Sequence, residues 1–261
     1  MELPTLSIGE FELVYNMLSL AIAAMLGSFV FFVIARNQLS LKYRPALIMS
    51  SLVVGIAGYH YWRIFNSWEG AFVLQDGVYK ASGQPFNDAY RYVDWLLTVP
   101  LLLAELVAVL TLSRAVRGPM MTRLIIAATA MIALGYPGEI ETDPTIRGIW
   151  GFASTIPFCY ILYVLWVQLT KATEGANSRV VSLLKDTRLL LLATWGFYPI
   201  AYLMPQLGIA KGSAIVALQV GYSIADILAK CGYGFMIYNI AVAKMEAEGV
   251  NPETLTNTVE A

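Results

Sequence analysis

Two residues of opposite charge lie four positions apart in an apolar run near the C-terminal end of the sequence. Asp226 and Lys230 belong to the run ADILAK (225–230), so on a helix both side chains share one face. A buried lysine can form a Schiff base with an aldehyde, and a carboxylate one turn away favours the protonated form of that nitrogen. A structural ion pair is the alternative, although such pairs often gain little against their desolvation cost.

A second apolar run carries four polar residues with helical spacing. They are Arg91, Asp94, Thr98 and Glu105. Offsets of three, four and seven place all four on one helix face, with Asp94 and Glu105 about 16 Å apart along the axis. Asp94 can accept a proton when ionised, whereas the apolar neighbours of Glu105 favour its neutral form. Two carboxyl groups at different depths indicate proton transfer along the helix; polar residues that merely line a helix bundle are the alternative.

The elements that carry these residues are long and apolar. The 261-residue chain is 58% hydrophobic and only 13% charged, whereas an ordinary soluble domain carries about 25% charged residues. Seven runs approach the roughly 20 apolar residues that a membrane-spanning helix needs. We therefore predict an all-α membrane protein with a single seven-helix transmembrane domain over 1–261. Its helices are expected at roughly 10–36, 44–68, 88–112, 120–138, 147–171, 180–208 and 212–243.

The connections between these runs differ in charge on the two sides. Basic residues gather in the connections that follow odd-numbered runs, and acidic residues gather in the others and at the N-terminus. The positive-inside rule therefore predicts an external N-terminus and a cytoplasmic C-terminus. The connection after the second run contains Asp76-Gly77 between apolar and aromatic residues, which predicts a small β-hairpin.

Composition also excludes some partners. The net charge of −1 argues against a nucleic-acid surface. A single histidine and two separated cysteines predict no metal site and no disulfide framework. Membrane lipids are the partners that such an apolar surface requires.

At these residues the chain resembles the microbial (type 1) rhodopsins over almost its whole length. Three runs carry the resemblance: RYVDWLLTVP (91–100) looks like the third-helix motif, WGFYP (195–199) the sixth-helix motif and DILAK (226–230) the retinal-lysine motif. The combination of Asp94, Thr98 and Glu105 resembles the proteorhodopsin-type proton pumps. Sodium pumps of the family would carry Asn and Gln in this triad, and chloride pumps lack the first acidic residue.

The resemblance implies a light-driven outward proton pump, a transporter rather than an enzyme, in the bacterial cytoplasmic (inner) membrane. All-trans retinal would be bound to Lys230 as a protonated Schiff base. Asp94 would be proton acceptor and counterion, Glu105 the proton donor and Asp226 the second counterion. Arg91 would balance the excess negative charge. Relatives form pentamers or trimers, so a homo-oligomer is expected.

Carried over position by position, the resemblance also implies a retinal pocket. It would be lined by Tyr92, Trp95, Thr98, Val99 and Leu102; by Met131, Gly135, Trp150, Ser154 and Thr155; and by Trp195, Tyr198, Pro199, Tyr202 and Ala229. Flat aromatic faces would restrict which bond of a conjugated chain can isomerise. For any one aromatic residue, ordinary bundle packing is the alternative.

Two further positions resemble subgroups of the family. His60 in the second run stands where the proteorhodopsin group has a histidine, which implies a hydrogen bond to Asp94. Gly151 stands where bacteriorhodopsin-like pumps have a large aromatic residue, and it resembles xanthorhodopsin, a subgroup that binds a carotenoid antenna. A hydroxylated carotenoid would then lie near Gly151, Phe152, Thr155 and Tyr202. A packing histidine and a glycine that permits close helix contact are the alternatives.

Three other functions compete with pumping. A photosensory receptor that signals through a membrane partner would share the fold and the lysine, but it would not need Glu105 for rapid reprotonation. An ion channel would usually carry carboxylates along the second run, and 45–62 has none. A structural seven-helix protein without a pigment would not need Asp226 beside Lys230.

Overall fold

The computed structural model describes residues 3–110, 112–141, 143–203 and 211–250. Its helices are α1 (Ile8–Ala35), α2 (Arg44–Ala71), α3 (Tyr90–Leu110), α4 (Arg114–Ile140), α5 (Pro144–Lys171), α6 (Ser178–Leu203), α7 (Lys211–Asp226) and α8 (Tyr233–Ala247). A π-helical segment, η3 (Ile227–Gly232), joins α7 to α8, and a short 3₁₀ turn, η1 (Arg36–Gln38), follows α1.

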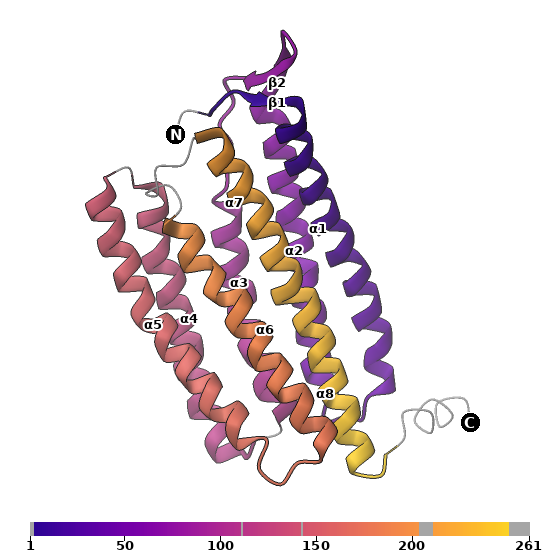
Figure 1. Cartoon of the computed structure of the whole chain (residues 1–261). Coiled ribbons are helices and arrows are strands. Elements are labelled where there is room, and N and C mark those ends of the chain that lie inside the picture. Colours follow the sequence, from indigo (N-terminus) through magenta and orange to yellow (C-terminus); the bar gives the residue numbers. More distant parts are fainter. Residues whose placement is uncertain (1–2, 111, 142, 204–210, 251–261) are drawn as a thin grey trace.

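The helices lie side by side in one bundle, with the N-terminal sheet at one end and α8 leading to the other (Figure 1). Because α7, η3 and α8 form one continuous rod, the described chain contains seven long helical rods. The predicted all-α seven-helix bundle is therefore confirmed. Five rods are long and apolar enough to cross a membrane: Ile8–Gln38, Tyr90–Leu110, Ala115–Ile140, Pro144–Lys171 and Gly212–Ala247.

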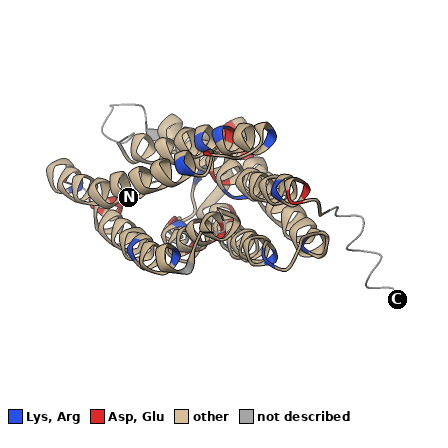
Figure 2. Ribbon diagram, turned by 90° about the horizontal axis from the view of Figure 1, so that it is seen from below, with Lys and Arg blue, Asp and Glu red and all other residues tan. Residues whose placement is uncertain are grey.

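The outer surface of the bundle is apolar. Large hydrophobic side chains such as Ile34, Phe152 and Tyr163 are more than half exposed on helix faces that have no protein neighbour. The view along the bundle shows that charged residues occupy a small part of the ribbon (Figure 2). Such a surface suits lipid rather than water.

Local sequence signals set several helix starts. Ser7 caps α1, where its hydroxyl accepts from the Glu10 N–H and the Glu10 carboxylate accepts in return from the Ser7 N–H at 2.9 Å. Asp143 caps α5 by accepting from the backbone N–H of Thr145 and Ile146, and Pro144 occupies the first helical position. These caps fix where the rods begin and so fix the depth of the residues inside them.

The predicted hairpin is confirmed in the connection between α2 and α3. Strands β2 (Phe72–Gln75) and β3 (Val78–Ala81) pair antiparallel around Asp76 and Gly77, which both have positive φ. A third strand, β1 (Leu6–Ser7), pairs with β3 on its other side, giving the order β1-β3-β2. The third strand was not predicted, because two residues carry no readable alternation.

The two largest departures from the expected helix ranges are in the fourth and the last helix. Helix α4 begins at Arg114 rather than near 120, because hydropathy marks only the apolar part of a helix whose first turns are polar. The last rod is interrupted by η3 around Lys230, which periodicity does not reveal. The expected end of the sixth helix, at 208, lies outside the described residues.

Candidate functional site

Lys230 lies between two carboxylates in the middle of the bundle. Its Nζ donates to Asp94 Oδ2 at 2.6 Å and lies 3.1 Å from Asp226 Oδ2. All three side chains are at most 2% exposed. Helix α3 supplies Asp94, while α7 and η3 supply Asp226 and Lys230 one turn apart. The spacing within the ADILAK run thus predicts the second contact, and only the fold shows the first.

Asp226 is held by two tyrosines. The Tyr61 hydroxyl from α2 donates to Asp226 Oδ2 at 2.9 Å, and the Tyr198 hydroxyl from α6 donates to Asp226 Oδ1. Arg91 Nη1 donates to the Tyr61 oxygen at 2.9 Å and lies 3.9 Å from Asp226 Oδ2. Hydrogen bonds and a second cation therefore favour the ionised form of Asp226.

Arg91 also reaches toward the end of the bundle that holds the sheet. Its Nε donates to Asp88 Oδ1 at 2.7 Å, and its Nη2 donates to Gln219 Oε1 at 2.6 Å. Gln219 Nε2 in turn donates to Asp88 Oδ2 at 3.0 Å. Tyr61, Asp88 and Gln219 were not predicted from the sequence, because no spacing within one helix connects them to Arg91.

Glu105 lies further along α3, where the neighbouring side chains are apolar. It is fully buried, and its Oε2 accepts a hydrogen bond from the Ser50 hydroxyl of α2. Oε1 has no hydrogen-bond partner among the described residues. Because an unpaired buried carboxylate is costly, these surroundings favour the neutral acid. Ser50 was another partner that the sequence analysis did not identify.

Thr98 and His60 satisfy backbone carbonyls of their own helices. Thr98 Oγ1 donates to the Asp94 carbonyl at 2.9 Å. His60 Nδ1 lies 3.0 Å from the Ile56 carbonyl and 3.9 Å from Asp94 Oδ1, which is too long for a hydrogen bond. The expected hydrogen bond through this nitrogen is therefore absent. The reason is that the carbonyl four residues earlier lies closer to it.

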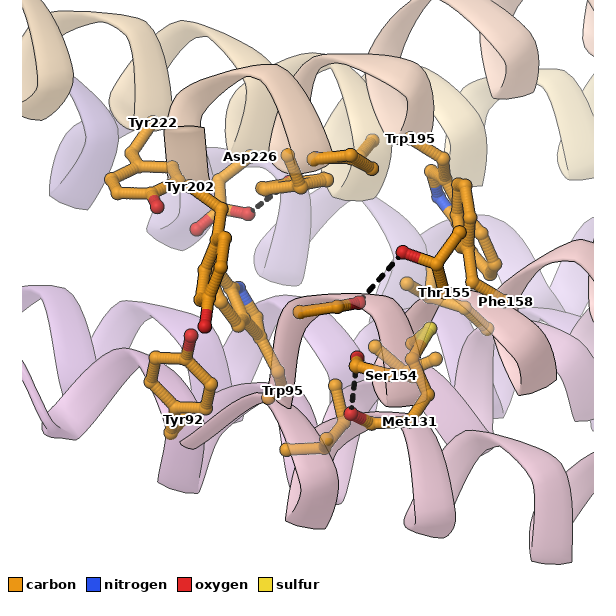
Figure 3. A pocket seen from close by; sticks show the side chains of 18 of the residues that line it. Tyr92, Trp95, Met131, Ser154, Thr155, Phe158, Trp195, Tyr202, Tyr222 and Asp226 are labelled. Carbon is orange, nitrogen blue, oxygen red and sulfur yellow. Dashed lines mark hydrogen bonds between the residues drawn. The ribbon is translucent and has the colours of Figure 1, made fainter. Parts of the chain in front are cut away.

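A cavity of about 310 Å³ lies beside Lys230, and Figure 3 shows several of the other residues that line it. Its lining includes the predicted Tyr92, Trp95, Val99, Leu102, Met131, Gly135, Gly151, Phe152, Ser154, Thr155, Trp195, Tyr198, Pro199, Tyr202, Asp226, Ala229 and Lys230. It also includes Ile132, Gly148, Phe158 and Tyr222, which the sequence analysis did not identify. In Figure 3, Trp195 and Phe158 lie at one end, and Tyr92 and Tyr202 lie at the other.

Thr98 is a predicted lining residue that this cavity does not include, and Trp150 is another. The Trp150 Cβ lies against the backbone of Gly138 in α4. The expectation that Trp150 contributes to the pocket wall is therefore corrected.

Tyr202 occupies the space that Gly151 leaves open. A Cβ at Gly151 would lie 2.7 Å from Tyr202 Cε1, and a Cβ at Gly138 would collide with the Tyr202 hydroxyl. That hydroxyl donates to the Arg147 carbonyl at 2.9 Å. The two glycines thus form a slot for this ring. Beside it Phe152 is 72% exposed while lining the cavity, so the cavity wall extends to the outer surface.

A buried ion pair supports this wall from the side of α4 and α5. Arg147 Nη2 donates to Glu139 Oε2 and to the Tyr202 carbonyl, both at 3.0 Å. The guanidinium also lies over the Tyr202 ring, 4.5 Å from its centroid. Glu139 and Arg147 therefore hold α4, α5 and α6 together at the end of the cavity near Tyr92.

The lining suits an apolar ligand that carries one aldehyde. Trp95 packs edge-on against Tyr198 and Tyr222, with ring centroids 5.1 and 5.6 Å away, so flat faces surround the space. The volume falls within the range of roughly 300–1,000 Å³ typical of small-molecule sites. A single amine, Lys230 Nζ, lines the cavity with a carboxylate on either side of it. Retinal has this chemistry, and the residues fit it.

Comparison with known proteins agrees with this site. A sequence model of the family described as bacteriorhodopsin-like protein matches residues 12–244. The crystal structure of xanthorhodopsin, described as a light-driven ion pump with dual chromophore, is 58% identical with a TM-score of 0.91; the match covers 96% of this chain and 100% of that one. A crystal structure of thermophilic rhodopsin is 54% identical with a TM-score of 0.91 and covers 95% and 99%. The green-light absorbing proteorhodopsin of Gamma-proteobacterium EBAC31A08 is 31% identical over 85% of this chain and 84% of its own length.

Proposed function

The chain belongs to the bacteriorhodopsin-like protein family, and we propose on this basis that it is a light-driven outward proton pump with retinal bound to Lys230 as a protonated Schiff base. The observation that carries the proposal is the 2.6 Å contact between Lys230 Nζ and Asp94, on the helix that also holds the buried Glu105. Asp94 can take a proton from the lysine nitrogen, and Glu105 can store one.

When bound, retinal supplies visible absorption and a light-driven change of shape beside Lys230. Asp94 then accepts the proton of the lysine nitrogen, while Asp226 stays ionised through Tyr61 and Tyr198. Glu105 returns a proton to that nitrogen from the other side. The positive-inside rule places the N-terminal sheet outside and Glu105 nearer the cytoplasm, so the net movement of protons is outward.

The location and assembly follow from the same family. We place the protein in the bacterial cytoplasmic membrane as a multi-pass chain surrounded by lipid, as a homo-oligomer of three or five copies. The exposed apolar faces of the bundle leave room for both lipid and neighbouring copies.

The photosensory alternative is less favoured by the residues. A receptor needs the lysine and its counterions, but it has no use for a proton store on the far side. Glu105, which is fully buried and accepts from Ser50, is such a store. Burial of the Glu105 carboxyl costs free energy. Pumping explains why the protein carries this residue, whereas signalling does not.

Illumination of unbuffered cells that express the protein with added retinal tests pumping. Reversible acidification of the medium, abolished by a protonophore, is expected. The variant Lys230→Ala should give neither pigment nor acidification. A visible pigment without any pH change would favour the receptor. No pigment in the parent protein would contradict the proposal altogether.

We extend the proposal to His60. Its ring lies 3.9 Å from Asp94 Oδ1, close enough to influence the proton affinity of that carboxyl without a direct hydrogen bond. The acid-induced colour change of His60→Asn tests this role. A transition at the same pH as in the parent protein would contradict it.

We further propose that a hydroxylated carotenoid serves as antenna on the outer wall of the cavity. The support is the slot at Gly151 and Gly138, which draws Tyr202 inward and leaves Phe152 and Thr155 on an exposed apolar face. After addition of the carotenoid, the excitation spectrum of retinal fluorescence should contain carotenoid bands. The variant Gly151→Trp should displace Tyr202 and remove them. Their absence in the parent protein would contradict the antenna and leave the pump intact.

A further inference from the structure

A closed ring of hydrogen bonds lies between the lysine site and the end of the bundle that holds the sheet. It joins Asp88, in the connection before α3, to Arg91 of α3 and Gln219 of α7. Arg91 donates to both other residues, at 2.7 Å to Asp88 and 2.6 Å to Gln219. Gln219 closes the ring by donating to Asp88 at 3.0 Å. Both carboxylate oxygens of Asp88 therefore accept from this ring.

The members of the ring differ in their access to water. The side chain of Arg91 is 2% exposed and Gln219 is 1% exposed, whereas the side chain of Asp88 is 26% exposed. Asp88 is thus the member of the ring that borders the outside. The ring also fixes the Gln219 amide, because its oxygen must face the guanidinium and its nitrogen must face the carboxylate.

Arg91 is held from the inner side as well. Its Nη1 donates to the Tyr61 hydroxyl, which donates to Asp226. The guanidinium therefore lies between an inner carboxylate pair, Asp94 and Asp226, and an outer carboxylate, Asp88. Its position sets how much positive potential reaches Asp94.

Other titratable groups face the same cluster. The Tyr222 ring of α7 lies 5.0 Å from the Arg91 guanidinium carbon. His60 of α2 lies on the far side of Asp94, and Tyr198 of α6 donates to Asp226. The Glu139–Arg147 pair of α4 and α5 carries opposite charges, and Glu139 is near enough to Asp88 to interact electrostatically.

We propose that Asp88, oriented by Gln219, is the positioning residue that holds Arg91 outward and thereby controls proton release to the outside. The inference rests on the proposed pump. Once Glu105 has reprotonated the lysine nitrogen while Asp94 still holds its proton, the inner cluster carries one negative charge fewer than in the dark, while Asp88 keeps its own. The guanidinium is then drawn toward Asp88, and its contact with Tyr61 weakens. The route from Asp94 to the outside opens, and it closes again when Asp94 has lost its proton.

Removal of the outer charge tests this role. In Asp88→Asn, Arg91 keeps only its inner carboxylate partners, and more positive potential reaches Asp94. The acid colour transition of the dark pigment should move to lower pH by about one unit. Proton release, followed with an external pH dye after a flash, should lag further behind the reprotonation of the lysine nitrogen. Asp88→Glu should restore both the pH of the colour transition and the time of proton release.

Two variants separate positioning from general charge effects. Gln219→Leu keeps the charge of Asp88 but removes its orientation, so it should give a smaller shift in the same direction. Asp76→Asn removes an exposed carboxylate that pairs with Lys80 in the hairpin, so it should change neither value. The visible band reports whether each variant folds.

The outcomes distinguish the two proposals. If Asp88→Asn pumps with the transition and release time of the parent protein, the role of Asp88 is overturned and the pump stands. An equal shift in Asp76→Asn would also overturn it, because a distant surface charge would then be sufficient. A parent protein that forms no pigment would overturn both proposals.

Discussion

The two carboxyl groups of α3 lie in opposite surroundings. Asp94 contacts Lys230 and belongs to a cluster with Asp226, Tyr61 and Arg91. Glu105 is buried among apolar side chains and accepts from one serine hydroxyl. The same helix thus offers one site that stabilises charge and one that resists it. In the proposed pump, this difference gives a direction to proton transfer, because an ionised acceptor and a neutral donor cannot exchange roles.

Removal of the acceptor should have the largest effect. In Asp94→Asn the lysine nitrogen loses the partner 2.6 Å away, and the amide cannot take its proton. Light-driven acidification should fall by at least about 100-fold. The absorption maximum should also stop responding to acid.

Flash spectroscopy and pH recordings on the same membranes check this prediction. Asp226→Asn is the matched control, since it removes a carboxylate of the same cluster that is not the proposed acceptor. Pumping by Asp94→Asn at the rate of the parent protein would show that Asp94 is not the proton acceptor.

Removal of the donor should affect only the second half of the cycle. In Glu105→Gln the acceptor and its contacts are unchanged, so the first proton transfer should keep its rate. Reprotonation of the lysine nitrogen should slow roughly 100-fold, the usual contribution of a general acid. Added azide, a small diffusible acid, should restore the rate. An unchanged rate of reprotonation in Glu105→Gln would show that Glu105 is not the proton donor.

Loss of the hydrogen bond from Ser50 to Glu105 should have a smaller effect. The Ser50 hydroxyl donates to Glu105 and would stabilise the anion that forms when Glu105 gives up its proton. Loss of one such hydrogen bond, worth about 1 kcal/mol, should slow recovery in Ser50→Ala roughly fivefold. Ser51→Ala is the control, because that hydroxyl donates to the Ile48 carbonyl. Equal rates in both variants would contradict a role for the serine.

A third carboxyl, outside the bundle core, shows the smallest expected effect. Burial alone would raise the pKa of Glu248, but hydrogen bonds from Lys42 and Tyr43 outweigh it and lower that pKa below 4.5. A pKa that is lower in the folded state stabilises the fold at pH values above the pKa of the unfolded chain. This contribution is lost as the pH falls through the pKa of the folded state.

The variant Glu248→Gln should therefore unfold at a slightly lower temperature at pH 7. The difference should be at most about 1 kcal/mol, because the pair is exposed. It should shrink as the pH falls below 4.5. Thermal loss of the visible band at several pH values measures it, and a pH-independent difference would contradict the charge-based explanation.

The sequence predicted the residues that share one face of a single helix. Asp226 and Lys230 are one turn apart, and Arg91, Asp94 and Glu105 share a face, so helical spacing was sufficient. Ser50, Tyr61, Asp88 and Gln219 could not be predicted in the same way. Each contacts the site from another helix or a connection, and pairing between elements is set by the packing of the whole bundle.

Two local geometries also escaped prediction. His60 was expected to bond Asp94, but the nearer carbonyl of Ile56 takes its Nδ1. At Gly151 the Tyr202 ring fills the space beside the glycine, a packing that was not predicted. In both cases a short-range contact within the bundle decided the outcome, which residue type alone does not reveal.

The pairing of β1 with β3 has a consequence for the biogenesis of the protein. Leu6 and Ser7 leave the ribosome before their partners Tyr79 and Val78, which follow more than seventy residues later. The N-terminal segment must therefore remain unpaired until the first two helices and the hairpin have been made. Completion of this small sheet is a late step in membrane insertion, and a bulky domain fused ahead of β1 would hinder that step before it disturbed any helix.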